Sequence, residues 1–312
     1  METSKTVVVL VTYQPKEKTV QLLESFIHEG QAFLLVDNGS KASAITAKLQ
    51  ELCQEGKRKL DLLASDWISL EENKGLAAAQ NVGIRKAKEL GAEGIFFFDQ
   101  DSAIPDHFFK DMVLEYNRLL KNYPIGILAP NLYDSNLHQY GRYARLTPHG
   151  YETLHDIKQA ESVSFVVSSA SFMPIEVFEG DDLFREEFFI DQVDTEWSLR
   201  LLSRSYAIVV TNRVTFSHTI GDRTEHHFLG LTIRPNHHGA LRKFYIFRNG
   251  RKTIEIYGKT FPGFKRLMTF RLIHDVLGVI LYEKDKEKKI SAMWKGWKMG
   301  KQALEEWKAY ED

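Results

Sequence analysis

The sequence predicts an α/β fold, in which a mostly parallel sheet is flanked by helices and followed by a helical C-terminal extension. Short apolar runs rich in β-branched residues, such as 7–11 and 33–36, alternate with amphipathic segments, such as 18–29 and 42–55. This alternation favours a parallel sheet, because parallel neighbours need a crossover between them. With 43% hydrophobic and 27% charged residues in 312, the chain can bury the core that such a fold requires.

The same pattern continues along the chain. We predict strands at 60–64, 94–98, 125–129, 163–167 and 207–211, and helices at 75–90 and from Pro105 to about residue 122. Residues 133–161 show little periodicity and are expected to form loops. We expect one domain over residues 1–257, divided near residue 130, and an amphipathic helical extension over 258–312.

Two features point to an intracellular protein. The single cysteine, Cys53, excludes a disulfide within the chain and a cysteine-based zinc site, which suits a reducing compartment. The N-terminus runs from Ser4 directly into the apolar segment 6–12, without the basic-then-apolar layout of a secretory signal. We therefore expect a cytoplasmic location.

The net charge of −1 conceals an uneven distribution. Residues 242–301 contain 16 Lys and Arg against 5 Asp and Glu, so the rest of the chain is acidic. This segregation predicts a basic surface for an anionic partner, such as a diphosphate or the face of a bilayer. A solvated helical face is the alternative. No recognition motif accompanies the basic residues, so nucleic acid is not an expected partner.

The segment Phe96–Ser102 places Asp99 and Asp101 directly after three consecutive phenylalanines. We interpret the aromatic run as a buried strand whose tip leaves the core, with the two carboxylates pointing the same way because side chains two apart share a face. Such a pair repels unless a cation lies between, and Mg²⁺ or Mn²⁺ is the usual solution. The alternative is a polar turn at the strand end.

Polar residues also follow the first two apolar runs, as Thr12-Tyr13 and Asp37-Asn38. Ligands of parallel α/β sheets sit beyond the carboxyl ends of the strands. We therefore expect Thr12, Asp37 and Asp99 to meet at one edge. Asp37 has a second interpretation, as an Asx turn or a cap of the next helix.

Together the motifs Thr12-Tyr13, Val36–Ser40, Asn73–Gly83 and Asp99-Gln100-Asp101 resemble, in residues and order, those of family 2 glycosyltransferases, and within that family the rhamnosyltransferases. The resemblance covers roughly residues 5–250. It implies the GT-A fold, a nucleotide-sugar donor, a divalent metal and inversion at the anomeric carbon. Residues 1–130 would then bind the donor, and residues 131–257 would supply the acceptor side and the catalytic base.

The resemblance also implies which residues contact the nucleotide sugar. The expected set is Thr12, Tyr13, Asp37, Asn38, Asn73, Gly75, Asn81, Asp99, Arg242 and Arg248. Asp37 would accept the imide N–H of uracil or thymine, and a helix starting near Leu76 would aim its N-terminus at the diphosphate. Alternatively, residues 77–79 are simply a tightly packed helix and Asn81 is solvated.

Catalysis is expected from the acidic segment 188–200. Inversion needs one carboxylate to take the acceptor's proton, and in many relatives an acidic pair stands in the middle of this motif. Here Val193 occupies the first place and Asp194 the second. We therefore expect Asp194 to be the base, with Asp191 as the second candidate and Glu196 holding a helix start or an arginine. The alternative is that all three only cap a helix.

Two further roles follow from the resemblance. His218 is a candidate third ligand of the metal beside Asp99 and Asp101, although a structural histidine is equally consistent with the sequence. Arg242 and Arg248 are expected to neutralise the diphosphate as it leaves.

The C-terminal segment combines apolar and basic residues. Residues 264–282 are interrupted by four charged side chains, so we do not expect them to cross a bilayer. Ile290, Met293, Trp294 and Trp297 recur at helical spacing among lysines, which is typical of a helix lying in a membrane interface. Packing of this stripe on the catalytic domain, or on a second copy in a homo-oligomer, is the alternative.

The resemblance implies a metal-dependent inverting enzyme that moves L-rhamnose from dTDP-L-rhamnose to a glycan or lipid-linked acceptor of a bacterial cell wall or surface polysaccharide. It would work in the cytoplasm, at the inner face of the membrane. Two alternatives remain: a UDP-dependent galactofuranosyl or glucosyl transferase, and a non-catalytic nucleotide-binding or membrane scaffold protein.

Overall fold

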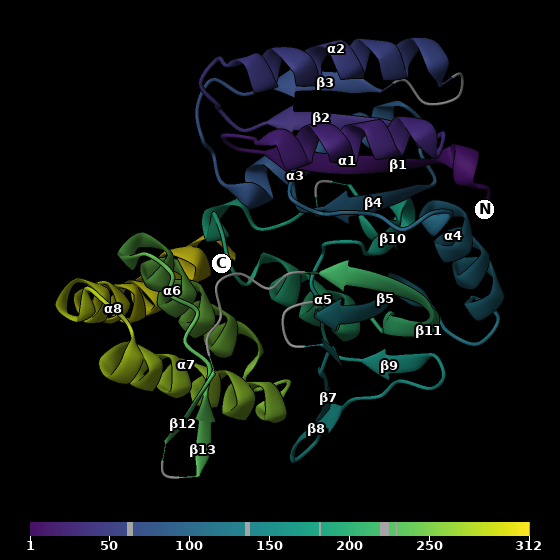
Figure 1. Ribbon diagram of the computed structural model, residues 1–312. Helices are drawn as coiled ribbons and strands as arrows, with labels where there is room; N and C mark the ends of the chain where they lie inside the picture. Colours follow the sequence, from purple (N-terminus) through teal and green to yellow (C-terminus); the bar gives the residue numbers. More distant parts are fainter. Residues whose placement is uncertain (61–64, 135–137, 181, 219–224, 229, 312) are drawn as a thin grey trace.

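A nine-stranded mixed sheet organises the computed structural model, which describes residues 1–60, 65–134, 138–180, 182–218, 225–228 and 230–311 (Figure 1). The strand order is β3-β2-β1-β4-β10-β5-β11-β9, with β6 paired to β5. The pairs β1–β2, β1–β4, β2–β3 and β5–β11 are parallel, whereas β10, β9 and β6 pair antiparallel with their neighbours. The predicted mostly parallel α/β sheet is confirmed.

The sheet strands are β1 (Thr6–Thr12), β2 (Phe33–Asp37), β3 (Asp66–Ser69), β4 (Gly94–Phe98), β5 (Ile125–Asp134), β6 (Gln139–Tyr140), β9 (Glu161–Val163), β10 (Phe172–Pro174) and β11 (Ala207–His218). Two hairpins stand apart, β7 (Tyr143–Thr147) with β8 (Gly150–Leu154), and β12 (His226–Phe228) with β13 (Leu231–Ile233). The helices are α1 (Glu17–His28), α2 (Ala44–Lys59), α3 (Leu76–Glu89), α4 (Phe108–Leu119), α5 (Val193–Ser203), α6 (Ala240–Tyr257), α7 (Pro262–Tyr282) and α8 (Lys286–Glu311).

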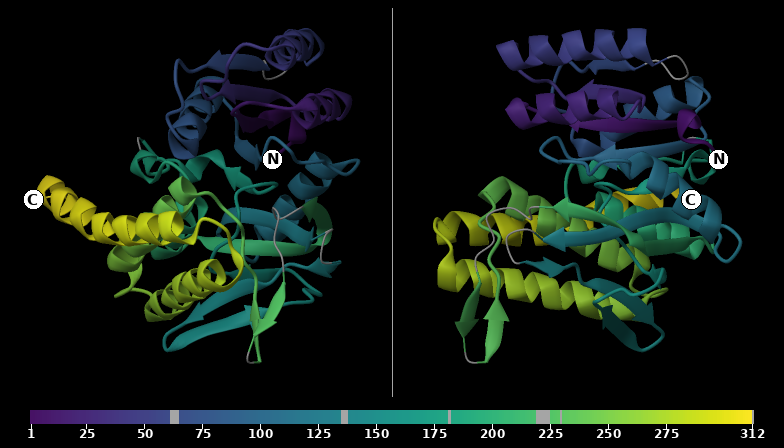
Figure 2. Two further views of the ribbon diagram at one scale, coloured as in Figure 1. Left: turned by 60° about the vertical axis from the view of Figure 1, so that its left-hand side comes forward. Right: turned by 45° about the vertical axis from the view of Figure 1, so that its right-hand side comes forward.

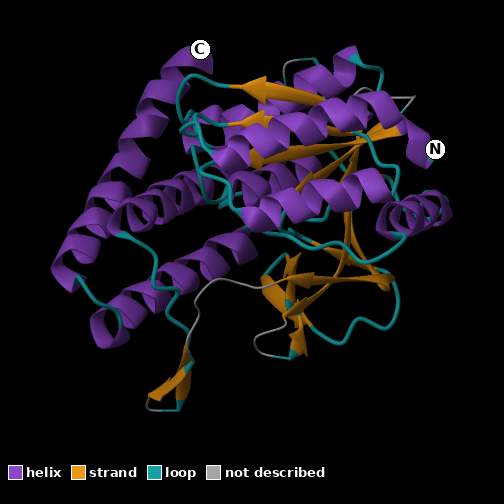
Figure 3. Cartoon of the chain, turned by 45° about the horizontal axis from the view of Figure 1, so that its top comes forward, coloured by secondary structure: helices purple, strands orange, loops and turns teal. Residues whose placement is uncertain are grey.

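Both faces of the sheet are buried, which explains the continuous apolar runs of its central strands. Val7 and Val9 of β1 join a core with α3 and α5, while Val8 and Leu10 join an aromatic-rich core with α1, α2 and α4. Figure 3 shows these helices packed over the strands. Helix α3 approaches β1 closely at Gly83, where a Cβ would lie 2.4 Å from a methyl carbon of Val9. Residues 77–79 are also buried, so the tightly packed helix considered for them is present.

Several predicted elements differ in extent. The strand expected at 60–64 falls mainly outside the described residues, and β3 lies just after it. The strand expected at 163–167 ends at Val163, and β11 continues beyond 211 to His218. The region 133–161 is not all loop, because it contains the end of β5, the short strand β6 and the β7–β8 hairpin. Strand β8 is largely exposed and lacks the apolar alternation that the sequence pattern detects.

Three helices, α6, α7 and α8, lie side by side away from α1 and α2 (Figures 1 and 2). The predicted division at residue 257 coincides with the end of α6, but α6 packs along α8 and shares a core with α7. Gly296 and Gly300 of α8 permit this packing, since a Cβ at either would lie within 2.6 Å of a carbonyl oxygen of α6. Within the described part of the chain, none of the helices is long and apolar enough to span a bilayer.

Candidate active site

The carboxyl ends of β1 and β2 meet in register, with Thr12 opposite Asp37. The Thr12 hydroxyl donates to Asp37 Oδ1 at 3.2 Å, and the backbone N–H of Ser40 donates to Asp37 Oδ2 at 3.1 Å. Both Thr12 and Asp37 are buried. The second interpretation of Asp37, as the acceptor of a local turn, is therefore observed, and a carboxylate retains acceptor capacity beyond these two bonds.

Gln100 joins β1 to the turn that follows β4. Its side-chain amide accepts from the backbone N–H of Tyr13 at 2.9 Å and donates to the Tyr13 carbonyl at 3.2 Å. The Tyr13 ring is left 46% exposed at this edge. No role for Gln100 was predicted from the sequence. Its position between two aspartates directly after a strand is the signal that could have indicated one.

Asp99 and Asp101 lie in a turn, not on a strand. Strand β4 ends at Phe98, and the backbone N–H of Ser102 closes the turn by donating to the Asp99 carbonyl at 3.1 Å. The prediction that strand spacing aligns the two carboxylates is therefore wrong, and the polar turn at the strand end is observed. Both aspartates are exposed at the sheet edge.

The loop before α3 is fastened to β2 by amide contacts. Asn38 donates to Asn73 Oδ1 at 3.0 Å and accepts from the backbone N–H of Lys74 at 2.9 Å, while Asn73 Oδ1 also accepts from the N–H of Gly75 at 3.0 Å. Gly75 has a positive φ of 90°, and a Cβ there would lie 2.6 Å from the Phe189 ring. Gly75 therefore admits a close approach by Phe189, whereas the sequence suggested an approach by a ligand.

Asn81 does not face the donor edge. Its amide donates to the Phe184 carbonyl at 2.8 Å and to Glu186 at 2.9 Å, and its carbonyl accepts from the Phe184 N–H at 3.0 Å. The side chain is buried and both of its polar atoms are occupied. We correct the predicted donor contact to a structural role that ties α3 to the segment before the catalytic motif.

Ser168 and Ser169 bring Asp194 next to Asp99. Ser169 accepts from the Asp99 backbone N–H at 3.1 Å, and the Ser168 backbone N–H hydrogen bonds to the Asp194 carboxylate. Burial raises the pKa of Asp194 to about 6, and the charges of Asp191 and Asp99 add to the rise against the hydrogen bonds from Thr195 and Ser168. Aspartates from two distant motifs therefore lie close enough to interact.

The loop that carries Asp191 is strained and held from α6. Phe189, Asp191 and Gln192 all have positive φ, between 61° and 65°, which is unfavourable for residues with a side chain. Asn249 of α6 is buried, and its amide donates to the carbonyls of Phe188, Ile190 and Asp191 at 2.7, 2.8 and 3.0 Å. Asn249 was missed by sequence reasoning, because nothing local marks an asparagine that bonds residues some 60 positions away.

The two arginines assigned to the diphosphate have partners within the protein. Arg242 forms a two-point ion pair with Asp191, with N···O distances of 3.1 Å. Arg248 hydrogen bonds to the Glu187 carbonyl and to Asn249, and its guanidinium lies 4.7 Å from the centre of the Tyr245 ring. Both arginines therefore contact the segment 187–191 or its neighbours in this structure, and their contact with the diphosphate stays a prediction.

Glu196 has the structural role expected of it. It is fully buried and accepts from Arg185 at 2.9 Å, from Arg200 at 2.5 Å and from the Tyr257 hydroxyl at 2.7 Å. A carboxylate satisfied by two guanidinium groups and a phenol stabilises the start of α5 and cannot act as the base. Asp194 and Asp191 remain the two candidates.

A complete protein-only metal centre is not formed by the described residues, among which no three His, Cys, Asp or Glu side chains gather to hold an ion. His218 ends β11 opposite Asp134, and its side chain lies outside the described part. The exposed carboxylates of Asp99 and Asp101 nevertheless suit Mg²⁺ or Mn²⁺, because Mg²⁺ commonly binds one or two carboxylates together with substrate phosphates.

Known proteins resemble this chain in sequence and in fold. Residues 7–180 match the family model described as glycosyl transferase family 2. The chain is 30% identical over 281 residues to the dTDP-rhamnosyl transferase RfbF of Shigella flexneri, and the match covers 89% of each protein. Among solved structures, residues 1–349 of TarS from S. aureus superpose with a TM-score of 0.56 at 15% identity, covering 93% of this chain and 79% of that one.

Proposed function

Because the chain belongs to glycosyl transferase family 2 and is a rhamnosyltransferase-like enzyme with the GT-A fold, we propose that it transfers L-rhamnose from dTDP-L-rhamnose to a glycan acceptor with inversion. The observation that carries the chemistry is the partly buried Asp194, whose pKa of about 6 suits a general base near neutral pH. Its neighbour Asp99 comes from the edge where three parallel strands end.

The proposed reaction is a single displacement. The acceptor hydroxyl attacks C1 of the sugar while Asp194 takes its proton, the bond from C1 to the diphosphate oxygen breaks, and the nucleoside diphosphate leaves with the bonding electrons. Asp194 is preferred to Asp191, because Asp191 is neutralised by Arg242. A positioned base contributes ~10²–10⁴-fold to the rate.

The donor would lie along the edge formed by β1, β2 and β4. Asp37 would accept the imide N–H of thymine, and the half-exposed ring of Tyr13 would offer a surface for the base. Asp99 and Asp101 would hold Mg²⁺ or Mn²⁺, which supplies Lewis-acid stabilisation of the departing diphosphate when bound. The dTDP specificity is supported by the name of the 30% identical relative.

We further propose a lipid-linked saccharide as the acceptor and the cytoplasmic face of a bacterial membrane as the place of work. The support is the concentration of basic and apolar residues in the C-terminal helices. Such an arrangement would bring the enzyme to an acceptor that diffuses in the bilayer.

Mass spectrometry of reaction products tests this function. The protein is incubated with Mg²⁺, a synthetic lipid-diphosphate saccharide and, in parallel, dTDP-rhamnose, UDP-galactofuranose or UDP-glucose. We expect a rhamnose adduct from the dTDP donor alone and none with Asp194→Asn. An adduct from a UDP sugar instead would replace the donor assignment, and release of no nucleotide diphosphate with any donor would favour the non-catalytic scaffold.

A further inference from the structure

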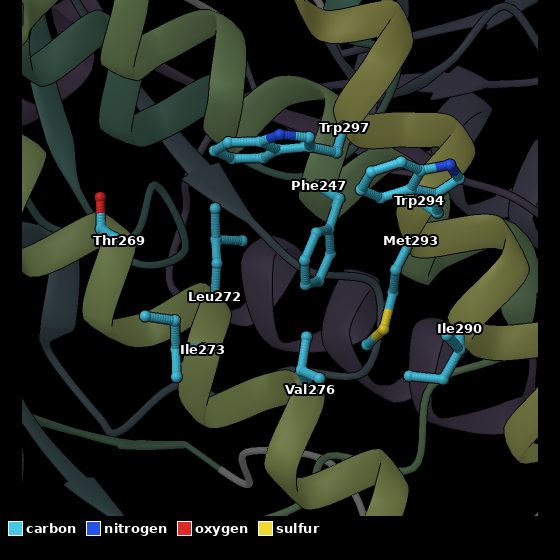
Figure 4. Close-up of a pocket in the computed structure, with 9 residues that line it drawn as sticks. All are labelled: Phe247, Thr269, Leu272, Ile273, Val276, Ile290, Met293, Trp294 and Trp297. Atoms are coloured by element: carbon cyan, nitrogen blue, oxygen red, sulfur yellow. The ribbon is translucent and has the colours of Figure 1, made fainter.

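An open apolar groove of about 380 Å³ lies between α7 and α8, with α6 as its floor. Phe247 forms the floor, Ile273 and Val276 line one wall, and Met293, Trp294 and Trp297 line the other (Figure 4). Its volume is within the range of about 300–1,000 Å³ that is usual for small-molecule sites. Nearly all of the lining side chains are hydrocarbon or aromatic, so the occupant must itself be apolar.

The groove continues into an exposed apolar stripe on α7. Phe270, Ile273, Leu277 and Ile280 are all exposed, and their spacing places them on one face of the helix. Ile273 belongs to both the stripe and the groove, and Trp294 across the groove is 60% exposed. A contiguous patch of this kind marks an interaction surface, whereas single exposed apolar residues do not.

Basic residues border this apolar face. Arg266 stands four residues before Phe270, Lys284 stands four residues after Ile280, and both are exposed. The ammonium group of Lys298 lies 5.3 Å from the centre of the Trp294 ring at the groove. Arg266, Lys284 and Lys298 therefore give the border of this face a positive charge.

We infer that the face formed by α7 and α8 docks on an anionic lipid bilayer and that a hydrocarbon chain of a membrane lipid enters the groove. Charge distinguishes a second copy of the chain from a lipid bilayer as the partner of this surface. A second copy would bring two cationic faces together, whereas anionic headgroups complement the basic border while the apolar stripe enters the hydrocarbon. The proposed lipid-linked acceptor explains why the enzyme would dock on a membrane. Docking itself does not require sugar transfer, so it can be tested separately.

The groove shares a helix with the active site. Phe247 on its floor immediately precedes Arg248 and Asn249, which hold the catalytic loop. Docking at the groove would therefore hold the loop, through α6, near the membrane surface, where the reactive end of a lipid-linked acceptor emerges.

Sedimentation with vesicles tests the inference on the full chain. Vesicles of phosphatidylglycerol and phosphatidylcholine are compared with vesicles of phosphatidylcholine alone, and Ile273→Glu is compared with Leu114→Glu. The two residues are matched, because both are helical and are 55% and 57% exposed, but Leu114 lies on α4. We expect binding to the anionic vesicles only, weakened at least about tenfold by Ile273→Glu and unchanged by Leu114→Glu.

Fluorescence locates the lipid chain. Phosphatidylglycerol brominated in its acyl chains should quench the tryptophan emission, and Trp294→Phe with Trp297→Phe should remove most of the quenching. Equal binding by Ile273→Glu, or binding without quenching, would overturn the inference. So would a dimer in solution that Ile273→Glu dissociates. Donor binding by each variant, measured separately, verifies folding and keeps failure here distinct from failure of the proposed reaction.

Discussion

Asp194 is held where its protonated form is favoured, because burial and the charges of Asp191 and Asp99 oppose ionisation. A base must be ionised to accept a proton. We therefore expect kcat/KM to be level above about pH 6 and to fall about tenfold for each pH unit below it. A pH–rate profile at constant ionic strength measures this. A profile that stays flat to about pH 5 would exclude Asp194 as the base.

The same shift affects the stability of the fold. The pKa of Asp194 is about 6 in the folded protein against 3.8 for an unperturbed aspartate, so its ionisation destabilises the fold fully above pH 6 and not at all well below 3.8. Asp194→Asn should therefore raise the Tm at about pH 7.5, with little effect near pH 3. It should also abolish transfer while dTDP-rhamnose still binds. A Tm gain that is the same at both pH values would contradict the assignment.

Asn249 is a positioning residue, because it bonds three carbonyls of the strained catalytic loop and touches no proposed substrate. Asn249→Leu should lower kcat by about 10²-fold while the donor Kd changes little, since small misplacement of a catalytic group has effects of this size. Steady-state kinetics and calorimetry separate the two. Asn212→Leu is the control, because among the described residues the Asn212 side-chain amide donates to the Lys158 carbonyl alone. Equal kcat losses in both variants would point to a general folding defect.

The exposed pair Asp99 and Asp101 carries the proposal of a metal. Chelation by EDTA should abolish transfer, and added Mg²⁺ or Mn²⁺ should restore it, because without the ion the departing diphosphate loses its charge partner. Asp99→Asn should weaken donor binding in the presence of Mg²⁺. Calorimetry of donor binding with and without Mg²⁺ measures this effect. Full turnover in EDTA would remove the metal from the mechanism.

At the scale of elements, a buried ionic network joins α6 to α7 and α8. Lys243 is fully buried and lies 2.6 Å from Asp275 and 3.0 Å from Glu283, and Lys289 pairs with Glu283 at 2.7 Å. Removing one member of a buried network leaves its partners desolvated without compensation, which is far costlier than losing a surface pair.

Lys243→Met should therefore lower the free energy of unfolding by about 3–5 kcal/mol, as measured by urea denaturation. Lys59→Met, which removes an exposed pair with Glu55, should leave the free energy of unfolding nearly unchanged. Similar losses in the two variants would mean that the network contributes no more than a surface ion pair.

The secondary-structure elements differ in how well the sequence predicts them. Strands β1, β2 and β4 were predictable because both faces are buried, which forces uninterrupted apolar runs. The β7–β8 hairpin was not, since its exposed strand Gly150–Leu154 carries no apolar alternation. A helical extension over 258–312 was predicted, with helical spacing at 290–297, but the packing of α8 on α6 through Gly296 and Gly300 depends on the facing helix.

At the scale of the whole molecule, Asn81 of α3 connects the N-terminal part of the sheet to the segment before α5 by its contacts with Phe184 and Glu186. Asn81→Ala would leave a buried N–H and C=O of Phe184 unsatisfied. We expect a loss of about 1–3 kcal/mol in unfolding free energy, measured in urea, with the donor Kd unchanged. A weakened donor affinity without a stability loss would instead restore the predicted ligand role.

The sequence by itself determined the family and the alternation of strands and helices in the first 130 residues, because local periodicity and short motifs encode these features. Only the tertiary structure decided what each polar side chain does. Asn81, Arg242 and Arg248 resemble donor ligands in their motifs, yet each has its partners far along the chain. The raised pKa of Asp194 likewise arises from burial and from charges that only folding brings together.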